Sequence, residues 1–426
     1  MHESDVLKLI DRDELVRLAV SLGEINSPTG HEGEVGDFLY EWLKDNGLPV
    51  FRQEVAPDRR NVIGVLRGKG GGLSLIFNTH MDSKYGSQED VWTVGELKRE
   101  YTSGWVDKDR IFGHGVYNAK GILAAFLVAA KAILQSGVEL KGDLLLTFVI
   151  GEIGTAPIDE FQGGRYRGKG VGTRCVVEHG VTSDFALVGE PTHNCIIRAQ
   201  AGAAYLKVTV RGESLYTPFI PRPVPVESNP SAIVKMAKVV HVLEAWACEY
   251  EKTHRYEFEG GAMVPKVSFG AIRGGLPYKI GNTVGVCSLY VDVRVPPPDD
   301  PARIREEILE RIAESGIDAE VEMYLFRRGY VAKSTGVLIE SIQRSHRSVF
   351  GRETDLPSPP MTSMWQDINV FNEVGIPAVS YGPMVMRAFE TGLDEDYVRV
   401  EDLFGICKSY ASVALDICRR PRSVAR

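Results

Sequence analysis

Three apolar segments of strand length each end in side chains that can bind a metal ion or transfer a proton, and this pattern constrains the fold most strongly. The segments and the side chains that follow them are Leu73–Phe77 before His80 and Asp82, Asp143–Ile150 before Glu152, and Phe185–Val188 before Glu190. A buried helix is predicted over Gly121–Gln135, between the first two segments. Alternating strands and helices predict a mostly parallel sheet that is covered on both faces. Because ligands bind at the carboxyl ends of such strands, we expect these four side chains to lie at sites of ligand binding.

The middle of the chain follows a different pattern, in which apolar and polar residues alternate as they do in half-exposed antiparallel strands. The alternating segments and the two helices predicted beside them are Tyr205–Val210, Val286–Arg294, Ala319–Leu325, Pro230–Thr253 and Pro301–Ser315. The α/β pattern returns near residue 330. We therefore predict an α/β domain in two parts, residues 1–197 and 330–426, with a small α+β domain of residues 198–329 inserted between them.

Composition argues against several classes of function. The 426 residues carry 49 basic and 57 acidic side chains, a net charge of −8, which argues against a general nucleic-acid-binding surface. The longest apolar run, around Ile122–Leu134, is shorter than a membrane span and contains Lys131. The N-terminal residues lack the basic and then apolar order of a signal peptide. Six scattered cysteines without a CxxC motif are typical of reduced thiols, so we expect a cytoplasmic protein with no membrane partner.

A set of short motifs in a fixed order is more specific than any single residue. The motifs are Thr79-His80-Met81-Asp82, Gly189-Glu190-Pro191-Thr192, Gly274-Gly275 with Asn282, Asp292-Val293-Arg294, Gln366-Asp367, Gly375-Ile376-Pro377 and Tyr381-Gly382-Pro383. Together they resemble the M20 family of metallopeptidases and amidohydrolases over nearly the whole chain. The resemblance implies a zinc-peptidase-like α/β catalytic domain with an inserted lid that commonly dimerises. We therefore expect a homodimer through the lid or a larger homo-oligomer.

The metal site implied by the resemblance departs from the family pattern, in which two metals are bound. His80 and Glu190 match ligands of one metal, but the bridging aspartate falls on Asn118, whose neutral amide brings no charge to hold two dications together. The late histidine ligand is also missing, because no histidine follows His346 and the corresponding segment is Phe389–Val398. We therefore expect one loosely bound divalent metal, either manganese, zinc or cobalt, on His80, Asn118 and Glu190.

The catalytic groups implied by the resemblance are altered as well. The general base of the family is the first glutamate of an E-E-x-G motif, which here reads Gly151-Glu152-Ile153-Gly154, so a glycine replaces the base. Glu152, which matches a ligand of the second metal, is the candidate to act as base, or it remains a metal ligand. Asp82 is expected to fix the tautomer of His80. The lid histidine that stabilises the oxyanion falls on Tyr216, which can still donate a hydrogen bond.

Substrates of the family usually carry a carboxylate, which an arginine can clamp with two hydrogen bonds. Arg198, Arg273 and Arg387 lie beside matched motifs and are the candidates, although each can instead be a surface residue. Asn282 of the lid is a further candidate for substrate binding. Tyr117 can either stack on an aromatic substrate or pack in the core.

These departures surround the reacting atoms, and they favour changed chemistry over a changed side-chain pocket. The favoured function is metal-dependent hydrolytic deamination of a small, electron-poor aromatic amine, of the 5-nitroanthranilate to 5-nitrosalicylate type. In that reaction the developing charge spreads into the ring, so less oxyanion stabilisation is needed. The first alternative is an N-acyl amino acid amidohydrolase or a small-peptide metallopeptidase. The second is a non-catalytic binding protein on a decayed hydrolase scaffold.

Overall fold

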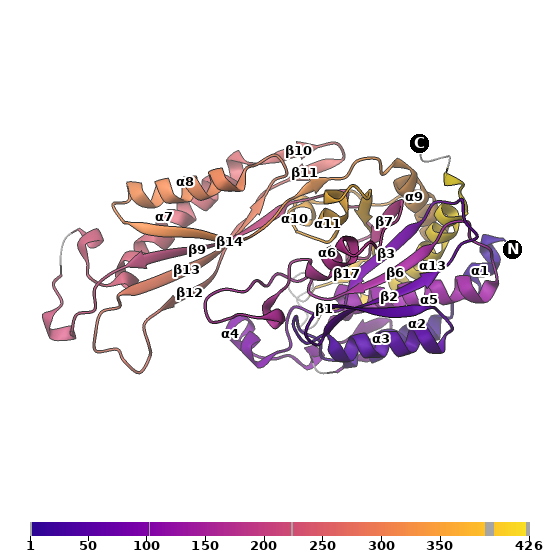
Figure 1. Ribbon diagram of the computed structural model, residues 1–426, viewed down its shortest axis with the longest axis horizontal. Coiled ribbons are helices and arrows are strands. Elements are labelled where there is room, and N and C mark those ends of the chain that lie inside the picture. Colours follow the sequence, from indigo (N-terminus) through magenta and orange to yellow (C-terminus); the bar gives the residue numbers. More distant parts are fainter. Residues whose placement is uncertain (1, 102, 223–224, 388–395, 423–426) are drawn as a thin grey trace. The chain divides into compact units, whose positions relative to one another are not determined.

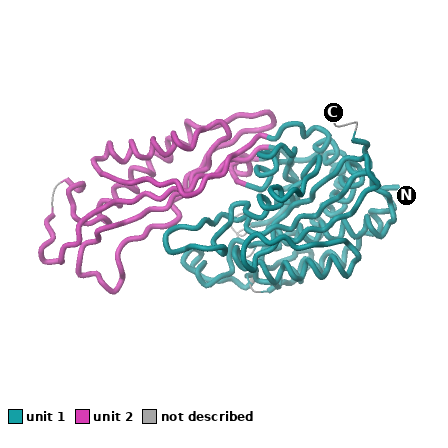
Figure 2. The backbone as a smooth tube through the Cα atoms, viewed as in Figure 1, with its two compact units in different colours: residues 1–198, 332–357, 366–426 teal, residues 199–331, 358–365 magenta. Residues whose placement is uncertain are grey.

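The computed structural model describes residues 2–101, 103–222, 225–387 and 396–422, and these fall into two compact units (Figure 2). Unit 1 spans residues 1–198, 332–357 and 366–426, and unit 2 spans residues 199–331 and 358–365. The sequence pattern places residues 358–365 in the catalytic domain, which is wrong. They pack with unit 2 because the Thr362 hydroxyl donates to the carbonyl of Ala262 at 2.7 Å and the Ser363 hydroxyl donates to that of Val264 at 2.5 Å.

Unit 1 is built around a six-stranded sheet with the order β1-β2-β6-β3-β7-β16 (Figure 1). Its strands are β1 (Val50–Ala56), β2 (Arg59–Leu66), β3 (Leu75–His80), β6 (Leu144–Val149), β7 (Phe185–Val188) and β16 (Ala378–Ser380). Strands β6, β3, β7 and β16 are parallel, whereas β1 and β2 pair antiparallel at one end of the sheet. The predicted mostly parallel sheet is confirmed, although the antiparallel strands lie in a region where no strand was expected.

Helices cover both faces of this sheet. The helices of unit 1 are α1 (Glu3–Leu7), α2 (Arg12–Glu24), α3 (Gly33–Asp45), α4 (Val91–Val94), α5 (Gly121–Ser136), α6 (Val171–Glu178), α9 (Gly336–Phe350), α11 (Ile368–Glu373) and α13 (Val400–Arg419). Strand β2 shows the two layers: Val62 and Leu66 belong to the main core that includes α3, whereas Ile63 and Val65 belong to a second cluster with Val176 of α6. Because both of their faces are buried, the parallel strands β6 and β7 are near-continuous apolar runs instead of alternating.

Helix α5 explains the longest apolar run of the chain. The segment Val116–Ser136 is long and apolar enough to cross a membrane by length and composition, but 83% of its most apolar window is buried inside the protein. Its Phe126 ring lies between Phe77 of β3, at 4.5 Å between centroids, and Tyr410 of α13, at 4.4 Å. The run is therefore accounted for by the core between the sheet and α13.

A smaller sheet of unit 1 has the order β17-β18-β5-β4. Its strands are β4 (Trp105–Asp107), β5 (Arg110–Phe112), β17 (Val385–Met386) and β18 (Tyr397–Arg399). This sheet joins the region before α5 to the end of the chain, because Val398 pairs with Ile111.

Unit 2 is an antiparallel four-stranded sheet with the order β12-β13-β9-β14 and two long helices, so the predicted α+β insertion is confirmed. Its elements are β8 (Ala199–Gln200), β9 (Gly202–Arg211), α7 (Ala232–Thr253), β10 (Tyr256–Phe258), β11 (Gly261–Met263), β12 (Val267–Gly274), β13 (Val286–Val295), α8 (Pro301–Glu314), β14 (Ala319–Arg327), β15 (Tyr330–Val331) and α10 (Pro359–Thr362). Helix α8 begins where the sequence predicts, because Asp300 caps the backbone N–H of Ala302 and Pro301 fits the first turn.

Candidate metal centre and active site

Three neighbouring parallel strands deliver three potential metal ligands to one edge of the sheet. Strand β3 lies between β6 and β7 and ends at His80, while Glu152 follows the end of β6 and Glu190 follows the end of β7. All three side chains are buried, and one ligand atom from each lies within 4.8 Å of the others. The structure therefore brings together the histidine and two of the carboxylates that the strand ends predict.

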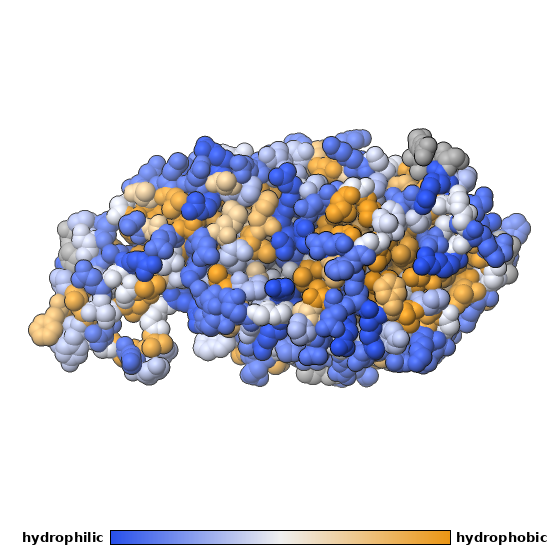
Figure 3. Space-filling model, viewed as in Figure 1, coloured by the Kyte–Doolittle hydropathy of each residue, from blue (hydrophilic) through white to orange (hydrophobic). Residues whose placement is uncertain are grey.

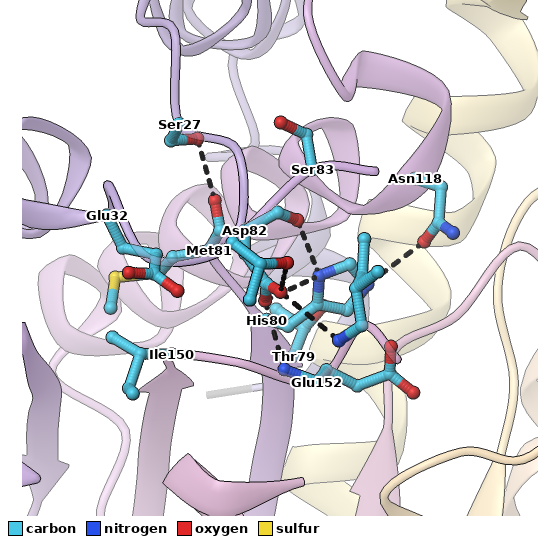
Figure 4. Close-up of polar contacts among 12 residues, drawn as sticks. Ser27, Glu32, Thr79, His80, Met81, Asp82, Ser83, Asn118, Ile150 and Glu152 are labelled. Carbon is cyan, nitrogen blue, oxygen red and sulfur yellow. Dashed lines mark hydrogen bonds and ion pairs between the residues drawn. The ribbon is translucent and has the colours of Figure 1, made fainter. Parts of the chain in front are cut away.

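The His80 ring is oriented by two neighbours that leave one nitrogen facing the cluster (Figure 4). Its Nδ1 donates to the backbone carbonyl of Asp82 at 2.8 Å and lies 3.5 Å from the carboxylate Oδ1 of the same residue. Its Nε2 lies 3.1 Å from the amide oxygen of Asn118 and 3.8 Å from Glu190 Oε1. Because Nδ1 carries the proton in this arrangement, Nε2 is free to act as a metal ligand.

Asn118 reaches the cluster because the backbone departs from helical geometry there. It lies in a short π-helical segment, Val116–Lys120, directly before α5, and has φ −158° and ψ 101°. Its peptide bond to Ala119 is cis. A neutral amide oxygen therefore stands next to His80, where the family resemblance implies a carboxylate.

Asp82 is held by hydrogen bonds from two different segments. Its carboxylate accepts the hydroxyl of Thr29 at 2.6 Å and the backbone N–H groups of Glu152 and Ile153, each at 3.1 Å. Burial alone would raise the pKa of Asp82, but hydrogen bonds from His80, Thr29 and the backbone hold it below its ordinary value. Asp82 thus remains a negative charge behind the histidine.

The remaining carboxylates hold their protons tightly when no cation is present. Burial raises the pKa of Glu152 to about 7 and raises that of Glu190 well above its ordinary value. Burial would lower the pKa of His80, but its hydrogen bond with Asp82 and the charge of Glu190 raise it well above the ordinary value. Glu190 Oε1 is buried and has no hydrogen-bond partner among the residues that the structure describes. These nitrogen and oxygen donors, with one unsatisfied carboxylate oxygen, fit a divalent transition metal.

Asp367 is a buried carboxylate near the cluster, and it is not among the site residues predicted from the sequence. Its Oδ2 accepts the hydroxyl of Thr173 at 2.6 Å and the amide of Asn78 at 3.2 Å, while its Oδ1 has no hydrogen-bond partner within the described part of the chain. Its charge acts on Glu152 and raises the pKa of that residue further. A signal was present, because Asn78 and His80 lie two residues apart on one strand and therefore share a face. A buried asparagine on that face needs a polar partner.

Gly151, which stands where the family resemblance implies the general base, has a backbone that disfavours any side chain. Its φ is +62°, in the left-handed region. A Cβ atom there would lie 2.8 Å from Val171 Cγ1, 2.9 Å from the carbonyl oxygen of Arg167 and 2.9 Å from Arg59 Nη2. The loss of the base is thus accompanied by a local backbone and packing that accommodate only glycine.

His114 belongs to a buried polar cluster beside the metal centre. Its Nε2 contacts the carbonyl of Tyr85, and its Nδ1 accepts the backbone N–H of Ser27 at 3.2 Å and lies 3.4 Å from Lys120 Nζ. Lys120 also donates to the carbonyl of Ile25. Burial lowers the pKa of His114 to about 4 and that of Lys120 to about 7. His114 therefore connects the segments that contain Ser27 and Tyr85 through its hydrogen bonds.

Two of the predicted substrate-binding residues lie in unit 1. Tyr117 is half-buried and packs against the main hydrophobic core, as one of the two interpretations of its position expects. Arg387 is half-buried directly after β17. Most of the segment Phe389–Val398, on which the missing late histidine falls, lies outside the described residues.

Tyr216, Asn282 and Arg273 belong to unit 2 and are described within that unit, whereas Arg198 is the last residue of the first part of unit 1. Tyr216 and Asn282 form an isolated antiparallel β-bridge with each other, so these two lid candidates lie side by side. Tyr216 is 58% exposed, and Asn282 is also exposed. Arg273 is exposed on the edge strand β12. The roles of Tyr216 in catalysis and of Arg273 and Asn282 in substrate binding stay predictions.

Comparisons with known proteins agree with the fold and the motifs. The model of Peptidase family M20/M25/M40 matches residues 76–416. The chain is 27% identical over 307 residues to N-formyl-4-amino-5-aminomethyl-2-methylpyrimidine deformylase from Halalkalibacterium halodurans, a match that covers 70% of this chain and 66% of that relative. It is 26% identical over 384 residues to acetylornithine deacetylase from Myxococcus xanthus, covering 86% of this chain and 87% of the relative.

A solved structure extends the agreement to the whole fold. The di-peptidase Dug1p from Saccharomyces cerevisiae superposes with a TM-score of 0.73 and 12% sequence identity, and the match covers 99% of both chains. At this identity the similarity shows the fold alone, an α/β catalytic domain with a separate inserted domain.

Proposed function

The chain belongs to peptidase family M20/M25/M40, a family of metal-dependent hydrolases, and from this premise we propose that it hydrolyses a C–N bond in a small carboxylate-bearing molecule. The buried cluster of His80, Glu152 and Glu190 favours an enzyme over the alternative of a non-catalytic binding protein on a decayed hydrolase scaffold. The proposed cofactor is one loosely bound divalent ion of manganese, zinc or cobalt. The proposed ligands are His80, Asn118 and Glu190, with Glu152 beside them.

One observation carries the proposal: the buried Glu152 carboxylate lies within 4.8 Å of the ligand atoms of His80 and Glu190, beside a glycine where the family base is expected. When bound, a divalent cation supplies Lewis acidity, which polarises the substrate and acidifies water. Glu152 then accepts a proton from the attacking water and passes it to the departing nitrogen. Burial raises the pKa of Glu152 to about 7 in the metal-free protein, and the charge of a bound cation would lower it again, so that the carboxylate is ionised and able to accept the proton.

The favoured reaction is hydrolytic deamination of an electron-poor aromatic amine. A C–O bond forms at the ring carbon, the C–N bond breaks, and the water supplies the hydroxyl of a phenol and the third proton of ammonia. A nitro group on the ring takes up the negative charge of the addition step, so the reaction depends less on an oxyanion donor. The amide at position 118 and the tyrosine at position 216, where the family pattern has aspartate and histidine, support this version.

The alternative reaction is hydrolysis of an N-acyl amino acid or a small peptide. It is favoured by the relatives themselves, which are named a deformylase and a deacetylase. In this version Glu152 again moves the proton, and Tyr216 is the candidate donor to the oxyanion. For either substrate class we propose that Arg273 or Arg387 binds the carboxylate.

We further propose that the protein forms a homodimer through unit 2, or a larger homo-oligomer, and acts in the cytoplasm without a nucleic-acid or membrane partner. Hydrophobic side chains are exposed among polar ones on this unit (Figure 3). They include Phe219 at 76%, Ile272 at 56%, Tyr278 at 78% and Ile280 at 83% exposure. An exposed apolar surface of this kind is typical of a protein–protein interface.

The test is turnover by chelator-stripped protein reloaded with manganese, zinc or cobalt. Amino-nitrobenzoates, N-acetyl amino acids and dipeptides form the substrate panel. The proposal predicts metal-dependent release of ammonia from an amino-nitrobenzoate. Cleavage of only the amides would replace the deaminase version with the alternative, and turnover that survives complete metal removal would contradict both.

A further inference from the structure

Arg59 is a buried arginine outside the cluster whose guanidinium makes hydrogen bonds through all three of its nitrogen atoms. Its Nε and Nη2 donate to the two carboxylate oxygens of Glu32 at 2.8 and 2.5 Å. Its Nη1 donates to the backbone carbonyls of Gly164 and Arg167, each at 2.6 Å. The side chains of Arg59 and Glu32 are 3% and 0% exposed. Arg59 therefore connects two protein segments: it forms a buried ion pair with Glu32 of one and hydrogen bonds with two carbonyls of the other.

The first of these segments, residues 27–32, contacts the residues around His80. Thr29 donates its hydroxyl to Asp82 Oδ2 at 2.6 Å. Ser27 donates its hydroxyl to the carbonyl of Met81 at 2.9 Å, as Figure 4 shows. Glu32 lies at the end of this segment and also accepts the backbone N–H of Gly30 at 3.1 Å. Because Thr29 and Glu32 belong to one short segment, the position of Glu32 influences the hydrogen bond that Thr29 donates to Asp82.

The second segment is the loop of residues 151–170, whose second residue is the candidate base, Glu152. Its two ends are joined by backbone hydrogen bonds: Gly170 donates to Gly151 at 2.9 Å and Lys169 donates to Ile153 at 2.9 Å. Arg59 binds the carbonyls of residues 164 and 167 within this loop. The loop that carries Glu152 is therefore connected through Arg59 to the segment that supports Asp82.

The two segments approach too closely to move independently. Gly30 has φ +97°, and a Cβ atom there would lie 2.5 Å from the carbonyl oxygen of Arg165. On the far side, Asp82 accepts hydrogen bonds from Thr29 of the first segment and from the backbone of Glu152 and Ile153 of the second. The segments thus meet directly at Gly30 and Arg165, and they are also joined through Arg59 and through Asp82.

We propose that Arg59 is a positioning residue which, through Glu32 and the loop carbonyls, sets the placement of Asp82 and Glu152 around the metal. Its hydrogen bonds go to Glu32 and to the carbonyls of Gly164 and Arg167, not to the proposed metal ligands. Lysine cannot replace it, because an ammonium group lacks the planar fork that binds a carboxylate and two carbonyls together. The inference builds on the proposed function, but its effect on metal affinity can be measured without any substrate.

The test uses three variants and a matched control, with manganese affinity measured by competition with a chromophoric chelator and with kcat and KM measured at saturating metal. Arg59→Lys replaces the planar guanidinium group by an ammonium group, and Thr29→Val removes only the hydroxyl that binds Asp82. Thr29→Ser restores that hydroxyl. The control is Arg52→Lys. Arg52 lies on β1, the strand next to that of Arg59, and pairs with Asp37 at 2.6 Å, but both of these side chains are partly exposed.

We expect Arg59→Lys and Thr29→Val to weaken manganese binding by about tenfold or more, as changes behind metal ligands commonly do. We also expect both to lower kcat at saturating metal with little change in KM. Thr29→Ser and Arg52→Lys should behave like the unchanged protein. A purely structural role predicts lower thermal stability with metal affinity and kcat unchanged, and that result would overturn the inference. If Arg59→Lys fails to fold, Thr29→Val decides alone, because unaltered metal binding in that variant refutes the connection.

If no substrate in the panel is turned over by the unchanged protein, the proposed function fails but the affinities still decide this inference. Normal turnover by the unchanged protein, together with normal manganese affinity in both variants, would instead overturn the inference and leave the proposed function intact.

Discussion

The carboxylate of Asp82 accepts the backbone N–H of Glu152 at 3.1 Å, so the residue that supports the His80 ring also fixes the start of the loop that carries the candidate base. The metal ligand and the base are thereby positioned by one buried charge. This link relates the altered E-E-x-G motif to the metal centre, because the backbone that follows Gly151 is held by Asp82 instead of by a side chain at position 151.

Gly151 cannot be converted back into a glutamate base without distorting the loop. Gly151→Ala should lower the free energy of unfolding by about 1–3 kcal/mol, because the backbone conformation and the contacts of a new Cβ are both unfavourable. Gly151→Glu should be at least as destabilised and should not gain activity. The measurement is urea-induced unfolding. Gly137→Ala is the control, since Gly137 has φ +69° but no atom of the described residues lies within 4 Å of a new Cβ. Equal losses in the two alanine variants would show that crowding at position 151 has no effect.

Asn118→Asp tests whether position 118 provides a metal ligand. The amide oxygen lies 3.1 Å from His80 Nε2, so a carboxylate of the same shape would add one negative charge at the centre. Manganese affinity at pH 8 should rise by roughly tenfold or more, because ligand charge strengthens binding of a divalent cation. The readout is chelator competition together with the metal-to-protein ratio. An affinity equal to that of the unchanged protein would place Asn118 outside the metal's ligands.

The pH dependence of metal binding follows from the protons that the cluster holds. Glu152, Glu190 and His80 all have a raised pKa in the metal-free protein, and each must lose its proton before it can bind a cation. Metal affinity should therefore rise with pH through about 7. Affinity measured in buffered chelator at pH 6, 7 and 8 checks this, and a flat profile would contradict it.

The same groups make the metal-free protein less stable as pH rises. The folded-state pKa of Glu152 is about 7, above its ordinary value of 4.5, so the folded state holds this proton more tightly than the unfolded chain does. The resulting stability is present below pH 4.5 and is lost as pH rises through about 7, by up to about 3 kcal/mol. Denaturant unfolding of the chelator-treated protein at pH 5 and pH 8 measures the loss.

Lys120 makes the protein more stable as pH rises, which is opposite to the effect of Glu152, and it does so in a higher pH range. Its folded-state pKa is lowered from 10.5 to about 7 by burial, so its cost to stability is full below pH 7 and disappears as pH rises toward 10.5. Lys120→Met should therefore raise the free energy of unfolding at pH 7 by about 1–3 kcal/mol and flatten its rise between pH 7 and pH 10. A variant that is less stable than the unchanged protein at pH 7 would show that the hydrogen bond to Ile25 outweighs the cost of burial.

The fold and the ligand positions could be predicted because they depend on local patterns. A strand buried on both faces is apolar throughout, and a parallel sheet brings the ends of β3, β6 and β7 to one edge, so His80, Glu152 and Glu190 could be placed together. Strands β1 and β2 were not predicted, because charged residues interrupt their apolar pattern; one of these residues, Arg59, is buried.

The surroundings of the cluster could not be predicted, because they depend on pairs distant in sequence. Arg59 and Glu32 lie 27 positions apart, and Asn78 and Asp367 lie 289 apart. Nothing local to either residue in a pair identifies its partner. The segment of residues 358–365 was misplaced for the same reason, since its hydroxyl groups bind carbonyls about a hundred positions earlier, as the 100 positions between Thr362 and Ala262 illustrate.

Glu152→Gln tests whether Glu152 moves the proton in a metal-dependent C–N hydrolysis. Turnover and manganese affinity are measured on the same preparation, with Glu178→Gln, an exposed glutamate of α6, as the control. Loss of a positioned general base typically lowers turnover about 100- to 10,000-fold. The account predicts a loss of that size in kcat at saturating manganese, while the protein still binds the metal. Full turnover by the metal-loaded Glu152→Gln protein would contradict it.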